Sequence, residues 1–185
     1  ILTHMRGRDQ TSWFPFARFI AESGYKVLTF DFRGYGKSTG IKDTRMDRDL
    51  EAAIAYMRAK GAQQVVLIGA SMGGTAVIEL ASESQVQGVA ALSPPAEFGR
   101  INALTAVESM VIPLLLIVSE NDYQYYSDAR KIESAAAATQ FLVVEGQQHG
   151  TNMIAEHRNE IFANLLAFLD RWTDDRLLTT VQTES

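Results

Sequence analysis

Short, almost wholly apolar runs recur along the chain. Five of them lack the alternation of polar and apolar positions that a half-exposed strand shows. They occupy residues 26–30 (KVLTF), 64–69 (QVVLIG), 88–92 (GVAAL), 114–119 (LLLIVS) and 140–144 (QFLVV), and residues 1–3 (ILT) look like the end of a sixth. Strands that helices cover on both faces have this composition. The pattern therefore predicts buried, parallel strands.

Amphipathic segments lie between these runs. Apolar side chains recur at helical spacing, with charged residues opposite them, at Met46, Leu50, Ala53, Ile54 and Met57. Further helices are expected over residues 14–23, 72–83 and 127–138, and a last one closes at Trp172. Strands that alternate with helices of this length need right-handed crossovers. The expected fold class is therefore α/β, a three-layer α/β/α sandwich with a mostly parallel sheet of about six strands.

Composition narrows the class of protein. With 185 residues, 46% of them hydrophobic and 21% charged, the chain can build one domain with a substantial core. We expect that domain over residues 1–172 and a polar, fraying tail over residues 173–185. The net charge of −5 offers no attraction to nucleic acids or anionic membranes, and the lack of cysteine excludes disulfides, thiolate nucleophiles and cysteine-bound metals.

Targeting signals are not visible in the sequence. No apolar run approaches the roughly 18 residues that a membrane span needs, and no secretory leader pattern opens the chain. The cytoplasm is therefore the default location.

A glycine–serine motif follows the QVVLIG run. Gly69-Ala70-Ser71-Met72-Gly73 is a G-x-S-x-G pattern placed where a strand turns into a helix. Such a turn exposes the serine hydroxyl, its glycines let neighbouring backbone pass close by, and the N–H groups of the helix can stabilise an oxyanion. Ser71 is therefore the candidate nucleophile. The alternative is a glycine-rich turn whose serine only caps the helix.

A serine nucleophile needs an oriented base to accept its proton. Of the three histidines, His149 lies in the loop after the QFLVV run, at the carboxyl end of a predicted strand. His4 lies far upstream, and His157 begins the last predicted helix. His149 is therefore the candidate base, and a solvated loop histidine is the alternative interpretation.

The orienting acid should lie just past the preceding strand, between the serine and the histidine in chain order. Asp122 follows the LLLIVS run by a short turn that can direct it toward His149. Glu120 follows the run directly, with no turn to redirect it, and Asp128 begins a predicted helix, where an acid can stabilise the helix dipole. Asp122 is the candidate, with Glu120 and Asp128 as rivals.

These motifs together resemble the α/β-hydrolase superfamily, especially its compact, capless bacterial esterases and dienelactone-hydrolase-like members. The resemblance extends to about Trp172 and rests on four segments in order: residues 4–7 (HMRG) with Trp13, residues 31–38 (DFRGYGKS), the elbow at Ser71, and Asp122 with His149. It implies a nucleophile, an acid and a base at Ser71, Asp122 and His149.

The same resemblance implies an oxyanion hole built from the backbone N–H groups of Met72 and Arg6. Family members usually have glycine after the histidine that matches His4, whereas this chain has Met5 there. A side chain at that position restricts how closely the backbone can approach. Whether Arg6 or Met5 supplies the second donor is left open.

The glycine-rich segment at residues 34–38 (GYGKS) is not a phosphate loop. The Walker pattern requires a glycine five positions before Gly36, where this chain has Asp31. The segment instead resembles an architectural turn of the family. No metal and no cofactor are expected.

A serine nucleophile favours acyl transfer from esters, thioesters or amides. The span from Ser93 to Pro113 has room for about one short helix and for no cap, which suits small esters. The expected function is a carboxylester hydrolase acting on a small-molecule ester. A peptidase or thioesterase of the same fold is the alternative, and a non-catalytic binding module is a third, which an intact triad disfavours.

The start of the chain suggests a missing partner for the sheet. Family members usually have eight strands, whereas this sequence supplies six at most. The strand at residues 26–30 would then be an apolar edge with unpaired backbone groups. We expect either an N-terminal extension before Ile1, which is favoured because the sequence opens mid-strand, or a homo-oligomer through this edge.

Overall fold

The computed structural model describes residues 1–173, apart from the side chain of Glu83. Its main sheet has six parallel strands in the order β2-β1-β3-β4-β7-β8. The strands are β1 (Leu2–Thr3), β2 (Thr29–Phe30), β3 (Val66–Ala70), β4 (Gly88–Leu92), β7 (Leu114–Ser119) and β8 (Thr139–Val144). The expected α/β class and the parallel sheet of about six strands are thus confirmed.

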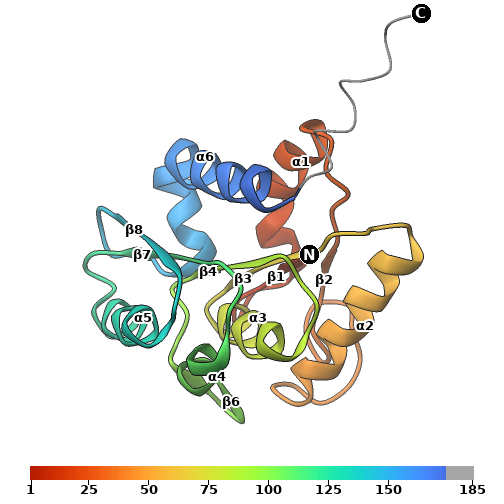
Figure 1. Ribbon diagram of the computed structural model, residues 1–185, viewed down its shortest axis with the longest axis horizontal. Helices are drawn as coiled ribbons and strands as arrows, with labels where there is room; N and C mark the ends of the chain where they lie inside the picture. The colour runs from red at the N-terminus through yellow and green to blue at the C-terminus, as the bar shows by residue number, and fades with distance from the viewer. Residues whose placement is uncertain (174–185) are drawn as a thin grey trace, which may run out of the picture.

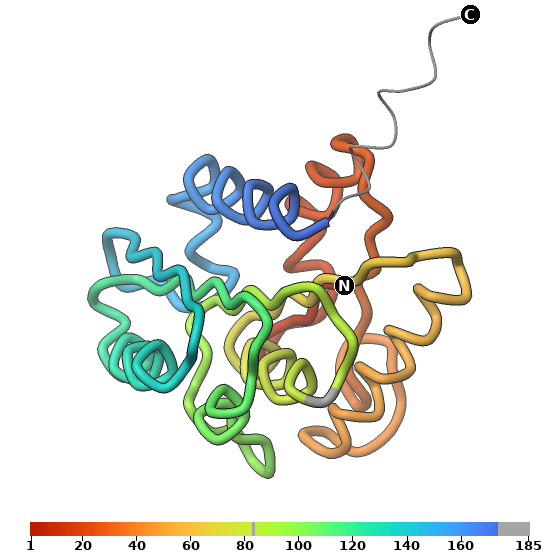
Figure 2. Tube along the Cα trace, viewed as in Figure 1, coloured from red at the N-terminus to blue at the C-terminus, as the bar shows by residue number. Residues whose placement is uncertain are grey.

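Helices cover both faces of the sheet, as Figure 1 shows. On one face lie α1 (Phe14–Glu22) and α6 (Ile154–Trp172), and on the other lie α2 (Met46–Ala59), α3 (Met72–Glu83), α4 (Ala103–Ser109) and α5 (Tyr123–Ala135). Two 3₁₀ turns, at Gln10–Trp13 and Gly150–Met153, precede α1 and α6. The chain path in Figure 2 shows the same three layers.

Two buried clusters, one for each face, explain why the strands are apolar at nearly every position. Leu67 of β3 packs with the cluster under α2 and α3, and its neighbour Ile68 packs with the cluster under α1 and α6. Both side chains are almost fully buried. A strand between two helical layers therefore has apolar side chains at most of its positions.

The predicted boundaries hold best in the centre of the sheet. β4 and β7 have the predicted bounds, whereas β2 covers only two of the five residues of the KVLTF run. β2 lies at the edge of the sheet, and its partner β1 has only two residues with which to pair. Whether this edge pairs with a second copy of the chain stays a prediction.

Two further elements differ from expectation. Helix α5 begins at Tyr123 rather than at residue 127, so the prediction that Asp128 begins the helix is wrong. Asp122 occupies the N-cap position, where its backbone carbonyl accepts a 2.8 Å bond from the N–H of Tyr126, and its side chain makes no capping bond. The span from Ser93 to Pro113 holds, besides α4, a small hairpin of β5 (Glu97–Phe98) and β6 (Ile101–Asn102).

The last described residue closes α6. The backbone N–H and the Oγ1 hydroxyl of Thr173 both donate to the carbonyl of Leu169, at 3.0 Å and 2.8 Å. The rest of the predicted polar tail, residues 174–185, lies outside the described residues. Within residues 1–173 no helix is long and apolar enough to cross a membrane.

Candidate active site

Ser71 occupies the sharp turn between β3 and α3. Its backbone has φ +49° and ψ −121°, a left-handed conformation that costs a non-glycine residue about 1–3 kcal/mol. The N–H of Ser71 donates a 2.8 Å hydrogen bond to the carbonyl of Leu92, the last residue of β4. This bond fixes the turn against the neighbouring strand, which helps the fold to hold the strained conformation.

The glycines of the motif are required by close approach of backbone. A Cβ on Gly69 would lie 2.3 Å from the carbonyl oxygen of Gly73. A Cβ on Gly73 would lie 2.6 Å from the carbonyl oxygen of His4 and 2.8 Å from that of Thr3. The expectation that these glycines let neighbouring backbone pass close to the elbow is confirmed.

The two expected oxyanion donors lie on segments that touch at Gly73. Met72 is the first residue of α3, and the first-turn N–H groups of a helix have no acceptor within it. Arg6 lies in the turn after β1, which is closed by a 3.2 Å bond from the N–H of Arg8 to the carbonyl of Met5. This turn therefore leaves the N–H of Arg6 unused by its own closing bond.

Met5, the departure from the family pattern, is buried against the loop that carries His149. Its Sδ accepts a 3.3 Å contact from the hydroxyl of Thr151, and a Cβ on Gly150 would lie 2.9 Å from that sulfur. The side chain thus packs between the loops after β1 and β8. Gly150 also has φ +55°, so both space and backbone conformation favour glycine there.

The structure brings Asp122 and His149 together. Nδ1 of His149 lies 2.8 Å from Oδ2 of Asp122, although 27 residues separate them in sequence. Asp122 follows β7 and His149 follows β8, so adjacent parallel strands deliver both side chains to the same edge of the sheet. Because Nδ1 contacts the acid, Nε2 is the nitrogen left to face a nucleophile.

Tyr125 is a neighbour of this pair that the sequence reasoning missed. Its ring centroid lies 4.0 Å from that of His149, at an interplanar angle of 41°. The tyrosine lies in the first turn of α5, directly after the Asp122 cap. It covers one face of the imidazole and limits the orientations open to it. The sequence would have indicated that Tyr125 lies near Asp122 only if the helix had been predicted to start at residue 123.

The rival acids have other partners. Glu120 is exposed and accepts a 3.1 Å hydrogen bond from the side-chain amide of Asn121. Asp128 lies in the second turn of α5, where one carboxylate oxygen accepts from the N–H of Ala96 at 3.2 Å and the other pairs with Lys131 at 3.0 Å. Within residues 1–173, neither carboxylate forms a hydrogen bond or an ion pair with His149.

The other two histidines lie in different surroundings. His4 is fully buried, and its Nε2 accepts a 3.1 Å bond from the N–H of Phe32, so its Nδ1 carries the proton donated to the carbonyl of Met5. Burial lowers the pKa of His4 below its ordinary value of 6.5. His157 lies in the first part of α6, at a kink with φ −115° and ψ 30°, 3.9 Å from the carboxylate of Glu160.

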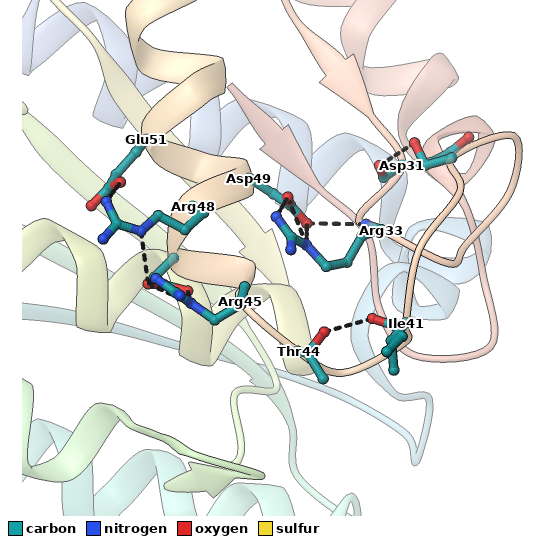
Figure 3. A network of polar contacts seen from close by, with 10 residues as sticks. Asp31, Arg33, Ile41, Thr44, Arg45, Arg48, Asp49 and Glu51 are labelled. Carbon is teal, nitrogen blue, oxygen red and sulfur yellow. Dashed lines mark hydrogen bonds and ion pairs between the residues drawn. The ribbon is translucent and has the colours of Figure 1, made fainter.

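The DFRGYGKS segment makes contacts within the fold, as Figure 3 shows. The Asp31 carboxylate accepts from the backbone N–H groups of Gln10 and Lys37, at 2.8 Å and 2.9 Å. The backbone N–H and Nε of Arg33 both donate to Asp49 of α2, at 3.0 Å. The turn after β2 is thereby fastened to the 3₁₀ turn at Gln10–Trp13 and to α2, in agreement with an architectural role.

A second polar cluster surrounds the Arg6 side chain. The guanidinium lies 3.4 Å from the carboxylate of Asp43 and 5.8 Å from the ring centroid of Phe98 in β5. Asp43 also accepts a hydrogen bond from the hydroxyl of Tyr35. Burial, followed by this bond, raises the pKa of Tyr35 to about 12. The sequence patterns gave no signal for these contacts.

A polar cleft of about 800 Å³ opens beside the His149 loop. Its walls come from the loops after β1 and β2 and from the start of α6: Gly7, Arg8, Asp9, Thr11, Ser12, Tyr35, Gly36, Lys42, Gln148, Thr151, Asn152, Ala155 and Glu156. Gln148 precedes His149 in the chain, so the cleft reaches the immediate neighbour of the predicted base. Across the described residues, no group of three or more metal-ligating side chains gathers at one place.

The sequence is similar to a known protein family and to characterised hydrolases. The sequence matches the family described as the alpha/beta hydrolase fold over residues 7–130. It is also similar to the 2-hydroxy-6-oxononadienedioate/2-hydroxy-6-oxononatrienedioate hydrolase of Klebsiella pneumoniae, with 35% identity over 83 residues, which make up 42% of this chain and 29% of that protein. The matched segment thus spans less than a third of that relative's length.

Solved structures share the architecture over nearly the whole chain. The monoacylglycerol lipase of Paleococcus ferrophilus superposes with a TM-score of 0.80 and 17% identity, over 93% of each chain. The esterase domain of a Rhodothermus marinus protein superposes with a TM-score of 0.75 and 23% identity, over 92% of this chain and 85% of that one. At such identities the likeness establishes the fold alone.

Proposed function

The chain belongs to the family of hydrolases with the alpha/beta fold, and from this premise we propose that it is a serine carboxylesterase acting on small esters. The observation that carries the proposal is the 2.8 Å contact between His149 and Asp122 at the sheet edge where β3 ends in the strained turn of Ser71. These are the three groups that acyl transfer through a serine requires.

In the proposed reaction, Oγ of Ser71 attacks the carbonyl carbon of the ester while Nε2 of His149 accepts its proton. The negative charge that develops on the carbonyl oxygen is stabilised by the N–H of Met72 and by a second N–H from the loop after β1, of Arg6 or of Met5. The imidazolium then protonates the departing alcohol. A water molecule, deprotonated by the same imidazole, releases the acid and restores Ser71.

Asp122 has two tasks in this scheme. Its hydrogen bond to Nδ1 holds the tautomer in which Nε2 can accept a proton, and its negative charge stabilises the imidazolium that forms. Tyr125 supports the same orientation from the face of the ring. An imidazole held in this way loses little entropy on reaching the reactive geometry.

Two features support a small, polar substrate. We take residues 1–172 as one catalytic domain without a cap, since the span from Ser93 to Pro113 contains only a small hairpin and the seven-residue helix α4. None of Ser71, Asp122 and His149 lines the cleft beside Gln148, and we propose that an ester held at Ser71 extends past the His149 loop into it. Its walls are mostly polar side chains, so it suits the hydrophilic part of an ester better than a long hydrocarbon chain.

The proposal is tested by replacing the nucleophile. Ser71→Ala should lower kcat/KM for p-nitrophenyl acetate by roughly 10³-fold or more, because no other group can form the acyl-enzyme. Ser134→Ala, which removes a hydroxyl on the exposed side of α5, is the matched control and should retain activity. A fluorophosphonate probe should label the wild type and the control, with Ser71 as the modified residue.

Each other outcome identifies an alternative. Retained activity in folded Ser71→Ala would show that the nucleophile is wrong. An inactive wild type that resists the probe would favour a binding module, and an active one that prefers a thioester or an amide over the matched oxygen ester would favour the thioesterase or peptidase alternative.

A further inference from the structure

Two fully buried serines hold the peptide groups on either side of His149. The hydroxyl of Ser119 donates a 2.7 Å hydrogen bond to the carbonyl of Gln148, and the hydroxyl of Ser93 accepts a 3.1 Å bond from the N–H of Gly150. Neither serine side chain is exposed to solvent. The histidine is therefore held through both of its chain neighbours, by the last residue of β7 and by the residue that follows β4.

Ser93 connects the loop of His149 to the turn of Ser71. It directly follows Leu92, whose carbonyl accepts the backbone N–H of Ser71 at 2.8 Å. Two consecutive residues at the end of β4 thus hold the predicted nucleophile and the loop of the predicted base. Ser93 itself has φ +46°, and its N–H is bonded to the carbonyl of Ile117 at 2.8 Å. A strained backbone at a fully buried position indicates that its surroundings dictate the conformation.

Ser119 connects the same loop to the acid. It is the last residue of β7, and its carbonyl accepts the backbone N–H of Asp122 at 3.2 Å. Its hydroxyl meanwhile holds the carbonyl of Gln148. Ser119, at the end of β7, thus bonds both the backbone of the predicted acid and the backbone next to the predicted base.

We infer that Ser93 and Ser119 are positioning residues, which set the place of His149 relative to Ser71 and Asp122. The inference rests on the proposed function and adds to it the means by which the base is located. Hydroxyls suit the task because each is short, lies at or just past the end of a strand and bonds a peptide group next to His149. A displacement of the imidazole by about 1 Å can cost on the order of 10²-fold in rate, so small losses of alignment are measurable.

The test removes each hydroxyl with little disturbance of the backbone. Ser93→Gly suits the positive φ of that residue, and Ser119→Ala keeps the strand. Thr173→Val is the control, since it removes another buried hydroxyl, one that bonds a carbonyl at 2.8 Å at the end of α6, away from His149. We expect kcat for p-nitrophenyl acetate to fall about 10- to 100-fold in each serine variant with KM within about twofold, and Thr173→Val to keep the wild-type kcat.

A spectroscopic readout separates this inference from the proposed function. In the wild type, the Nδ1 proton of His149 that bonds Asp122 should give a protected, downfield proton resonance. In folded Ser93→Gly and Ser119→Ala this resonance should broaden or disappear, whether or not the protein hydrolyses the ester. Unchanged kcat and an unchanged resonance in both variants would overturn the inference, whereas loss of Ser71 dependence alone would overturn only the proposed function.

Discussion

The carbonyl oxygen of His4 and the α-carbon of Gly73 approach so closely that a Cβ on residue 73 would lie 2.6 Å from that oxygen. Through this contact the loop after β1 rests on the first turn of α3. The contact joins the two segments on which the expected oxyanion donors lie, since His4 precedes the turn that contains Arg6 and Gly73 follows Met72.

The contact predicts that Gly73→Ala will damage both stability and turnover. The added methyl group must push the loop and the helix apart, and overpacking of this kind costs about 1–3 kcal/mol. Because the displaced groups are the expected oxyanion donors, kcat should fall by at least about tenfold. Urea unfolding and ester hydrolysis measure the two effects.

Gly74→Ala is the matched control for this prediction. A Cβ on Gly74 would lie 3.3 Å from the Cβ atoms of Ala91 and Pro94, so these neighbours need to move by only a few tenths of an ångström. Its effect on both quantities should be smaller than that of Gly73→Ala. Equal or greater damage at residue 74 would show that the contact with His4 is unimportant.

The central strands could be predicted from sequence because burial on both faces leaves them uniformly apolar. β4 and β7 are bounded as expected for this reason. β2 is shorter than its apolar run because the length of a strand depends on its partner, and β1 offers only Leu2 and Thr3. The start of α5 was missed because the segment at residues 123–126 (YQYY) shows no apolar stripe, and the side chain of Asp122 makes no capping bond that a helix start would signal.

Some residues of the candidate site could likewise be predicted from the sequence and others could not. The positions of Ser71, Asp122 and His149 follow from where loops join strands, and the uninterrupted apolar runs mark the ends of those strands. Ser93 and Ser119 could not be singled out, because a small polar residue at a strand end acquires its partner only through the fold. Their hydrogen bonds cross 57 and 29 residues of sequence.

The second prediction separates the three acids. Asp122→Asn should lower kcat about 10³- to 10⁴-fold, because an amide no longer holds the imidazole in the reactive tautomer or stabilises its charge. The protein should remain folded, since the shape of the side chain is kept. Steady-state kinetics on p-nitrophenyl acetate with a thermal melt measure both.

Glu120→Gln and Asp128→Asn are the controls for the acid. Glu120→Gln should be nearly silent, because Glu120 is exposed. Asp128→Asn should lower stability slightly through its contacts with Ala96 and Lys131 while kcat stays within a few fold of the wild type. A greater loss of kcat in either control than in Asp122→Asn would reassign the acid.

The third prediction concerns the dependence of stability on pH. Burial lowers the pKa of His4 below 6.5, and its Nε2 is occupied by the N–H of Phe32. In the unfolded chain the imidazole takes up a proton near its ordinary pKa, so between the two pKa values the unfolded state binds more protons than the folded state. The contribution of neutral His4 to the free energy of unfolding is therefore complete above pH 6.5 and is lost as the pH falls toward the lowered pKa.

Comparison with a variant that cannot ionise isolates this contribution. The free energy of unfolding should be higher in the wild type than in His4→Gln near pH 7.5, and the difference should shrink as the pH falls to 5. Each unit by which the pKa is lowered corresponds to about 1.4 kcal/mol. Chemical denaturation at several pH values provides the data, and parallel curves for the two proteins would show that His4 is not responsible.

The last prediction concerns the length of the acyl chain. An apolar pocket gains about 0.8 kcal/mol for each buried CH₂ group, which would raise kcat/KM nearly fourfold per carbon until the pocket is filled. The cleft beside Gln148 is instead walled by polar and charged side chains, among them Arg8, Lys42 and Glu156, which offer no such gain. We therefore expect kcat/KM for p-nitrophenyl esters to be greatest for acetyl and butyryl groups and to fall for chains of ten or more carbons. A profile that rises steadily to ten carbons would mean that the acyl chain binds an apolar surface away from this cleft. Triacetin and tributyrin, measured by acid release, extend the comparison to esters without an activated leaving group and should keep the same preference for short chains.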